Sequence, residues 1–149
     1  MRVKMFLAVL LLALVTACSE QKTMFPENFA NPGVNTPPTG WLDDAAYSDG
    51  KFKAWGWAAD NEDGSPVTRV ALYVDNKLVG YAKLGIERPD VAKTMQRPDW
   101  AKAGWQIEAQ IQLPSGSHKA SAVAYDKMSA FTILSCVKPG QFEKEFLGK

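Results

Sequence analysis

The sequence is poor in the residues on which most catalytic and metal sites are built. Its 149 residues include one histidine, His118, and two cysteines, Cys18 and Cys136. One imidazole and two distant thiols exclude a multi-histidine metal site and form no convincing cysteine–histidine nucleophile pair. The sequence therefore predicts no catalytic residue, no metal ligand and no cofactor, and it indicates a protein that is not an enzyme.

Neither sign of charge is in excess. Seventeen Lys and Arg face sixteen Asp and Glu, a net charge of +1. Loss of an amino-terminal segment carrying Arg2 and Lys4 turns this into −1, because two cations leave with it. Such a balance excludes nucleic acid and anionic lipid headgroups as electrostatic partners.

The chain also lacks a hydrophobic run long enough to span a bilayer. Met5 to Val15 is an uninterrupted apolar run. At about 1.5 Å per helical residue it covers roughly 17 Å of a ~30 Å hydrocarbon core. Because basic residues precede the run and the small residues Thr16 and Ala17 follow it, residues 1–17 are predicted to be an export signal.

The end of this segment, Leu14-Val15-Thr16-Ala17-Cys18, resembles the lipobox of bacterial lipoproteins. The resemblance implies cleavage after Ala17, a lipidated Cys18 as the membrane contact, and a location in the cell envelope. Ser19, where inner-membrane lipoproteins commonly carry Asp, favours the outer membrane, on either side of it. The alternative is an ordinary secretory signal, which leaves Cys18 free to pair with Cys136.

Three segments follow the predicted signal. Residues 18–40 have no hydrophobic periodicity, contain four of the nine prolines, and are predicted to be a tether. Residues 41–138 are predicted to be one folded domain, and residues 139–149 a carboxy-terminal tail.

Within the domain the pattern is that of β-strands. Residues 105–113 alternate strictly between apolar and polar. A two-residue turn at Asp75-Asn76 predicts a hairpin in which Leu72 faces Val79 and Val70 faces Tyr81. With strands near residues 41–46, 51–59, 118–126 and 130–137, about seven strands are expected. Strands joined by short turns indicate an all-β antiparallel sandwich or barrel.

Residues 85–103 interrupt this pattern with a repeated tripeptide. Arg88-Pro89-Asp90 recurs as Arg97-Pro98-Asp99. Proline suits the first position of a helix and the following Asp its positive end, so two short helical turns are expected across one end of the domain. Each Arg is predicted to serve the structure by reaching across to a carboxylate or to free carbonyls.

Several motifs between residues 52 and 126 together resemble one family. They are Gly56-Trp57-Ala58-Ala59-Asp60, Tyr73-Val74-Asp75, Val79-Gly80, Arg88-Pro89-Asp90-Val91-Ala92, Gly104-Trp105 and Gly116-Ser117-His118. The order resembles the immunoglobulin-like sandwich modules of bacterial surface and cell-wall-associated proteins. Asn76 and Trp105 depart from that pattern, where Gly and Phe are usual. The resemblance implies an immunoglobulin-like sandwich, an imidazole of His118 bonded to backbone or to an Asp, and no catalytic residue. Together with the helical excursion expected at residues 85–103, this gives the predicted fold.

The tryptophans are the candidate ligand-binding residues. Trp55 and Trp57 alternate with small residues and therefore share one face of their strand. If the small residues point inward, both indoles point outward and offer a flat apolar surface to a sugar or a protein. The alternative is that residues 24–29, or the excursion with Trp100, cover them. Trp55, Trp57 and Trp100 are accordingly the predicted ligand-binding set.

Two further features have ordinary explanations. Residues 60–63 include three carboxylates but match no EF-hand spacing, so a solvated turn is expected in preference to a calcium site. Cys136 is expected to be buried in the last strand, with a disulfide or a reactive thiol as alternatives.

These observations predict a lipid-anchored, non-enzymatic envelope module that binds an envelope protein or a cell-wall or surface glycan, with no nucleic-acid partner. The alternative hypothesis is an accessory or inhibitor lipoprotein that modulates a periplasmic hydrolase.

Overall fold

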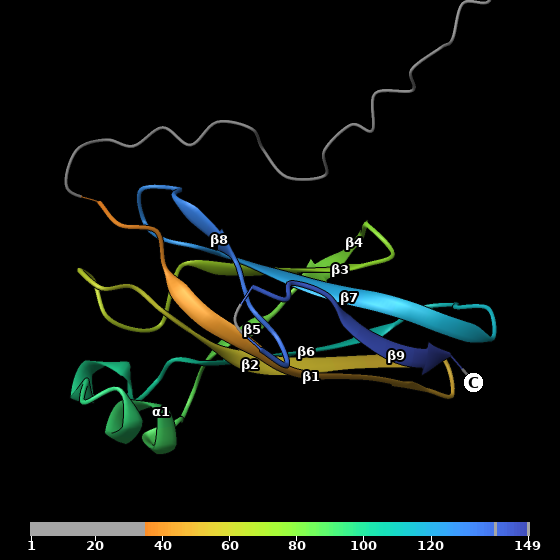
Figure 1. Cartoon of the computed structure of the whole chain (residues 1–149), viewed down its shortest axis with the longest axis horizontal. Helices are drawn as coiled ribbons and strands as arrows, with labels where there is room; N and C mark the ends of the chain where they lie inside the picture. Colours follow the sequence, from red (N-terminus) through yellow and green to blue (C-terminus); the bar gives the residue numbers. More distant parts are fainter. Residues whose placement is uncertain (1–34, 139, 149) are drawn as a thin grey trace, which may run out of the picture.

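Nine strands in two antiparallel sheets make up most of the described chain, residues 35–138 and 140–148, in the computed structural model (Figure 1). One sheet has the order β1 (Thr39–Ser48), β2 (Lys51–Ala59), β6 (Gly104–Gln110) and β5 (Lys83–Ile86). The other has the order β4 (Lys77–Tyr81), β3 (Arg69–Val74), β7 (Gly116–Tyr125) and β8 (Phe131–Ile133), and β9 (Lys144–Gly148) pairs with the first half of β7.

The strand order is that of an immunoglobulin-like sandwich. In their order across the sheets, β1, β2, β6 and β5 take the places of strands A, B, E and D, while β4, β3 and β7 take those of C′, C and F. The chain after β8 crosses to the other sheet: β8 pairs with β7, and Ser135, just beyond β8, forms an isolated parallel bridge to Trp41 of β1. The predicted all-β, immunoglobulin-like fold is confirmed.

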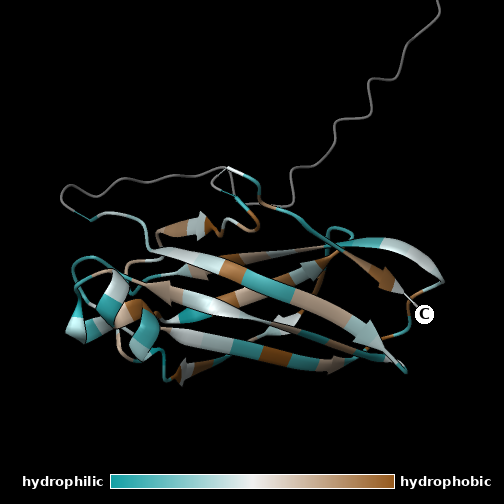
Figure 2. Cartoon of the chain, turned by 60° about the horizontal axis from the view of Figure 1, so that its bottom comes forward, coloured by the Kyte–Doolittle hydropathy of each residue, from teal (hydrophilic) through white to brown (hydrophobic). Residues whose placement is uncertain are grey.

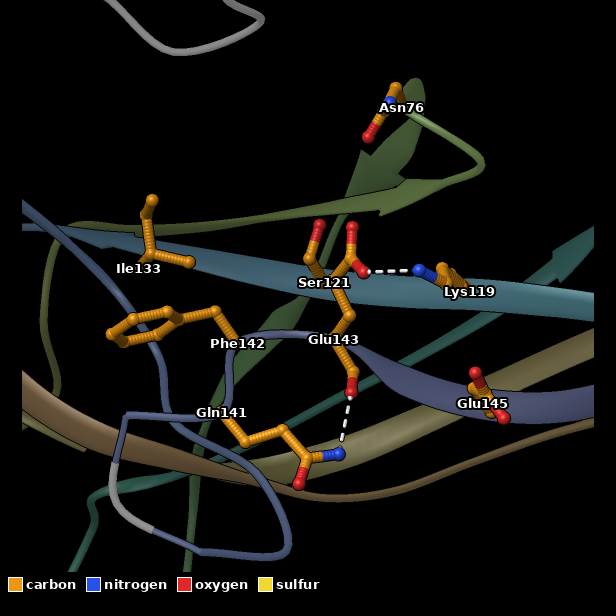
Figure 3. Close-up of a pocket in the computed structure, with 8 residues that line it drawn as sticks. All are labelled: Asn76, Lys119, Ser121, Ile133, Gln141, Phe142, Glu143 and Glu145. Carbon is orange, nitrogen blue, oxygen red and sulfur yellow. Dashed lines mark hydrogen bonds and ion pairs between the residues drawn. The ribbon is translucent and has the colours of Figure 1, made fainter.

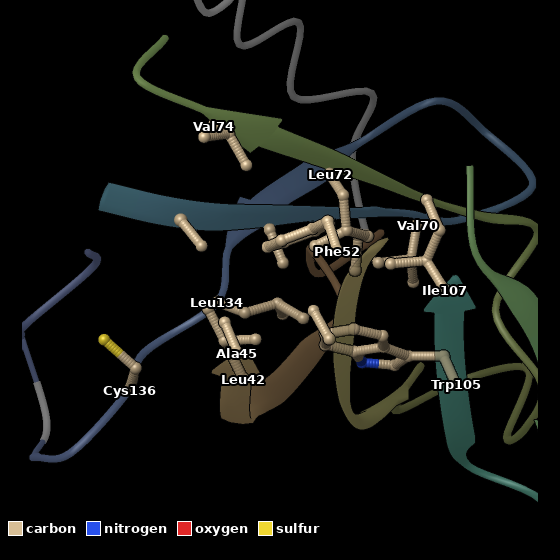
Figure 4. Packing of buried hydrophobic residues seen from close by; sticks show 14 of the residues in the cluster. Leu42, Ala45, Phe52, Val70, Leu72, Val74, Trp105, Ile107, Leu134 and Cys136 are labelled. Atoms are coloured by element: carbon tan, nitrogen blue, oxygen red, sulfur yellow. The ribbon is translucent and has the colours of Figure 1, made fainter. Parts of the chain in front are cut away.

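The core lies between the two sheets, where the inward side chains of both meet (Figure 4). The predicted alternation of β6 is confirmed, since Trp105 and Ile107 are buried while Gln106 and Glu108 are exposed. Trp105 is the largest fully buried side chain. Its ring lies directly over Gly56 of β2, where an added Cβ would come within 2.6 Å of the indole.

The β3–β4 hairpin has the predicted turn but not the predicted register. Asp75 and Asn76 have positive φ, as a two-residue turn requires. A bulge then leaves Val79 unpaired, so that Leu72 pairs with Gly80 and Ala71 with Tyr81. The expected pairs of Leu72 with Val79 and of Val70 with Tyr81 are therefore wrong. One extra residue turns Tyr81 outward, where it is 56% exposed.

The two strands beyond the expected seven are β5 and β9. β5 pairs with β6 at the start of the segment assigned to the excursion. β9 lies within residues 139–149, which were expected to be a tail. Phe146 explains why it forms, since this buried side chain packs on Phe52, with ring centroids 5.5 Å apart.

The helical excursion is confirmed. It consists of α1 (Pro89–Thr94) and one 3-10 turn, η1 (Pro98–Trp100), each with proline at its start. Both lie at one end of the sandwich (Figure 1). The predicted signal, Cys18 and most of the tether lie outside the described residues. Within residues 35–138 and 140–148, no helix is long and apolar enough to cross a membrane.

The inward face of β6 yields a paired test. Ile107→Asp places an unpaired carboxylate in the core and is expected to cost several kcal/mol, a large part of a typical stability of about 5–15 kcal/mol. Glu108→Ala removes an exposed partner of two lysines and is expected to change stability little, because solvent screens these ion pairs. Thermal melting of both variants checks this, and equal melting temperatures would show that the assigned face of β6 is wrong.

Candidate functional site

Trp55 lies on the outer face of the β1-β2-β6-β5 sheet and is 42% exposed. Strand register places it in a row with two polar residues, because Trp55 pairs with Gln106 and Gln106 pairs with Lys83. The neighbouring row pairs Lys53 with Glu108. Hydrophilic and apolar residues alternate along the strands of this molecule, so each sheet has one solvent-facing side and one side that packs on the core (Figure 2).

A hollow of about 320 Å³ lies beside this indole. Its outward lining is one indole, one amide and three charged side chains: Trp55, Gln106, Lys53, Lys83 and Glu108. Glu108 accepts from Lys51 at 2.8 Å and lies 3.2 Å from Lys53. These lysines lower the pKa of Glu108, Lys51 having the larger effect. In the described chain no ion pair involves Lys83, so the hollow is lined by one lysine ammonium group without a carboxylate partner.

The other two predicted ligand-binding tryptophans lie elsewhere. Trp57 and Trp100 are buried together with Val91 and Ala103 in a second apolar cluster under the excursion. The rings of Trp57 and Trp100 are 6.0 Å apart, and the Trp100 indole N–H donates to the carbonyl of Asp60. The structure therefore brings Trp57 and Trp100 to each other and leaves Trp55 as the uncovered indole of the three.

Arg88 and Arg97 hold the excursion in the predicted way. Each guanidinium binds the carboxylate two residues later, Asp90 or Asp99. Arg88 also donates to Asp43 of β1 at 2.7 Å, and these partners, Asp90 first, raise the pKa of Arg88. Arg97 donates to the carbonyl of Asn61 and lies over the Trp100 ring at 4.6 Å. Both copies of the Arg-Pro-Asp repeat thus hold the excursion in place over Trp57.

At the opposite end of the sandwich His118 is buried, and it bonds to an Asp and to a backbone carbonyl, the partners that the family resemblance implied. Its Nδ1 lies 2.6 Å from a carboxylate oxygen of Asp75, and its Nε2 lies 2.8 Å from the carbonyl of Pro114. Both ring nitrogens must donate to satisfy these partners, which is possible only for the imidazolium. Asp75, followed by Pro114, accordingly raises the pKa of His118.

The remaining candidate groups serve the fold. The solvated turn expected at residues 60–63 is exposed except at Asp60, which is buried and whose Oδ1 accepts from the backbone N–H groups of Glu62 and Asp63. Cys136 is buried as predicted, and burial raises the pKa of its thiol. Within the described residues no three His, Cys, Asp or Glu side chains are grouped to hold a metal ion.

A second hollow, of about 500 Å³, lies over β7 between the β3–β4 turn and the segment before β9 (Figure 3). Lys119 and Glu143 pair across it at 2.8 Å, and Phe142 forms an exposed apolar wall. Sequence analysis missed this hollow because its lining comes from four separate stretches of chain, and no motif joins them.

Fold and surface together define an immunoglobulin-like β-sandwich module with an exposed tryptophan site. No protein-family model matches the sequence, and no curated protein matches it. Among solved structures the chain is similar to fibronectin(III)-like modules of Clostridium thermocellum CbhA, with 17% identity and a TM-score of 0.40 over 75% of this chain and 95% of that one. It is also similar to the Yersinia enterocolitica family 28 exopolygalacturonase, with 12% identity and a TM-score of 0.37 over 76% of this chain and 21% of that one.

The contacts of Arg88 predict a structural defect on its removal. Arg88→Ala is expected to destabilise the domain by about 1–3 kcal/mol, the range for hydrogen bonds to charged groups, and to increase proteolysis between residues 85 and 103. Arg97→Ala is the matched control and is expected to cost less, because its carboxylate partner lies within the excursion itself. Urea unfolding and limited proteolysis measure both effects. Unchanged stability of the Arg88 variant would contradict this role.

The His118 pair predicts a pH dependence of stability. The folded pKa of His118 lies above its ordinary value of 6.5, so its stabilisation is complete below about pH 6.5 and is lost as the pH rises through the raised value. Partial burial alone would raise the pKa of Asp75, but hydrogen bonds from His118 and from the Lys119 backbone N–H outweigh it and lower that pKa. The stabilisation that Asp75 contributes is therefore lost only in acid. Stability is therefore expected to fall as the pH rises above about 6.5 and through the raised pKa of His118.

Urea midpoints across that range test the expectation. His118→Gln removes the only imidazole of the chain and is expected to flatten the profile. A wild-type profile already flat in this range would show that His118 does not carry the charge.

Proposed function

We propose that this chain is a lipid-anchored, non-enzymatic module of a bacterial cell envelope, which binds an envelope protein or a cell-wall or surface glycan. The observation that carries the binding half is Trp55, a large indole left uncovered beside a hollow on an outer sheet face. Indole offers wide contact area at little cost in conformational entropy, which is why binding surfaces use it.

The groups with the strongest chemistry are already engaged, which supports a non-enzymatic role. His118 is held between Asp75 and Pro114, so neither ring nitrogen is available as a base. Cys136 is buried with a raised pKa, the opposite of an activated nucleophile. The immunoglobulin-like sandwich is itself a scaffold on which surface sites, and not the fold, determine function.

The anchoring half of the proposal depends on the lipobox-like sequence that ends in Cys18. Lipid on Cys18 would hold the protein at a membrane, and Ser19 favours the outer one. A buried methylene contributes about 0.8 kcal/mol, and two acyl chains suffice for stable anchoring. The proline-containing stretch up to residue 38 would then separate the sandwich from the lipid surface.

Cys18→Ala in the full chain is expected to abolish membrane association and the incorporation of a fatty-acid analogue. Cys136→Ala is the matched control, since it removes the other cysteine and is expected to leave both unchanged. Fractionation of cells labelled with the analogue measures this. A Cys18 variant that stays in membranes and carries label would overturn the anchoring half.

The binding half is tested with the purified full chain in detergent, passed over peptidoglycan, surface polysaccharide and immobilised envelope proteins. Retention on at least one of the three supports the proposal, and retention on none overturns it.

A further inference from the structure

We infer that the hollow beside Trp55 binds an acidic saccharide, namely a pyranose unit that carries a carboxylate. This inference rests on the proposed function and narrows it to one ligand class. It is carried by the indole, the shape of the site and its charge.

The size and lining of the hollow fit a sugar. Its volume of about 320 Å³ is at the small end of the range for small-molecule sites, about 300–1,000 Å³. The indole of Trp55 provides a flat apolar surface, and the C–H face of a pyranose stacks on such a surface. Gln106, its neighbour across the strand pair, offers both an amide donor and a carbonyl acceptor to ring hydroxyls.

The charge of the site selects an acidic sugar over a neutral one. Two lysines and one carboxylate line the hollow, Lys53, Lys83 and Glu108, and Lys51 lies beside them. Asp44, which pairs with Trp55 on the β1 side, is neutralised by an ion pair with Lys144 at 3.1 Å. Glu108 engages two of the lysines, and Lys83 has no ion-pair partner in the part of the chain that the structure describes. The face therefore has two positive charges in excess and one free ammonium group to meet a ligand carboxylate.

The register sets a workable distance between the two anchoring groups. Trp55 and Lys83 lie in one row, separated by β6, so their backbones are about 10 Å apart. A pyranose stacked on the indole can turn its carboxylate toward Lys83, and the long lysine side chain spans the remainder.

The surroundings disfavour a protein partner. A stable protein interface buries about 800 Å² on each side around an apolar centre with few charges. Among the described residues of β2, β5 and β6, Trp55 is the only exposed large apolar side chain, and its outward neighbours are charged or amide groups. One indole in a ring of lysine, glutamine and glutamate fits a small polar ligand better.

The inference is tested with matched oligosaccharides and the full chain in detergent. The probes are β-1,4-linked hexamers of mannuronate and glucuronate, and the neutral hexamers of mannose and glucose with the same linkage. Titration calorimetry at low salt is expected to show binding of the acidic hexamers, weaker binding at high salt, and at least about tenfold lower affinity for the neutral ones.

Three variants and one control assign this binding to the site. Trp55→Ala is expected to lower affinity for the acidic hexamers at least about tenfold. Lys83→Gln is expected to remove most of the preference for acidic over neutral hexamers, and Glu108→Gln to strengthen acidic binding by freeing two lysines. Tyr81→Ala removes an exposed aromatic of the opposite sheet and is expected to change nothing.

Acidic hexamers that do not bind, neutral hexamers that bind equally well, or binding unaffected by Trp55→Ala would each overturn the inference. Its failure is distinguishable from failure of the proposed function. A chain that is retained by envelope proteins through Trp55, but not by acidic hexamers, keeps the proposed function and refutes the saccharide.

Discussion

The close approach of the Trp105 ring to the backbone of Gly56 is the contact on which the arrangement of this molecule depends. Because no Cβ fits beneath the indole, β2 presents its smallest residue to the core, and β6 supplies the bulk. This choice fixes which face of β2 is inward, since side chains alternate along a strand. Trp55 and Trp57 must then point outward, whatever covers them. The surface site is thus a consequence of how the core is packed.

Two tryptophans on one face have opposite environments because a different element lies over each. The two Arg-Pro-Asp turns cover Trp57, and their guanidinium groups hold the cover against β1 and against the loop after β2. Trp55 lies two residues before Trp57 in β2, where the excursion does not cover it. The same indole chemistry therefore contributes to stability at one position and is free for binding at the other.

Much of the fold was predictable from local sequence patterns. The remaining features of the fold and the site depend on contacts between residues far apart in the sequence. Alternation in β6, the turn at Asp75-Asn76 and the paired tripeptides follow from short-range rules, as does the all-β class. The bulge at Val79 does not, because it is decided by packing across the sheets. β9 was missed for a related reason: its short sequence has little apolar pattern, and it is held by Phe146 against the core. For the site, the sequence placed Trp55 and Trp57 on one face of their strand but left open whether that face is outward and uncovered. It did not predict the neighbours that register brings from β5 and β6.

The two ends of the described chain leave the sandwich at opposite ends of its long axis (Figure 1). β1 begins at one end and β9 finishes at the other, and each is hydrogen-bonded along its length to a neighbouring strand, β1 to β2 and β9 to β7. Hydrogen bonds between antiparallel strands are perpendicular to the strand direction. Tension applied between the two chain ends therefore acts in shear on whole ladders at once and does not peel them open bond by bond. Force along the strands is therefore expected to be resisted better than force applied across them.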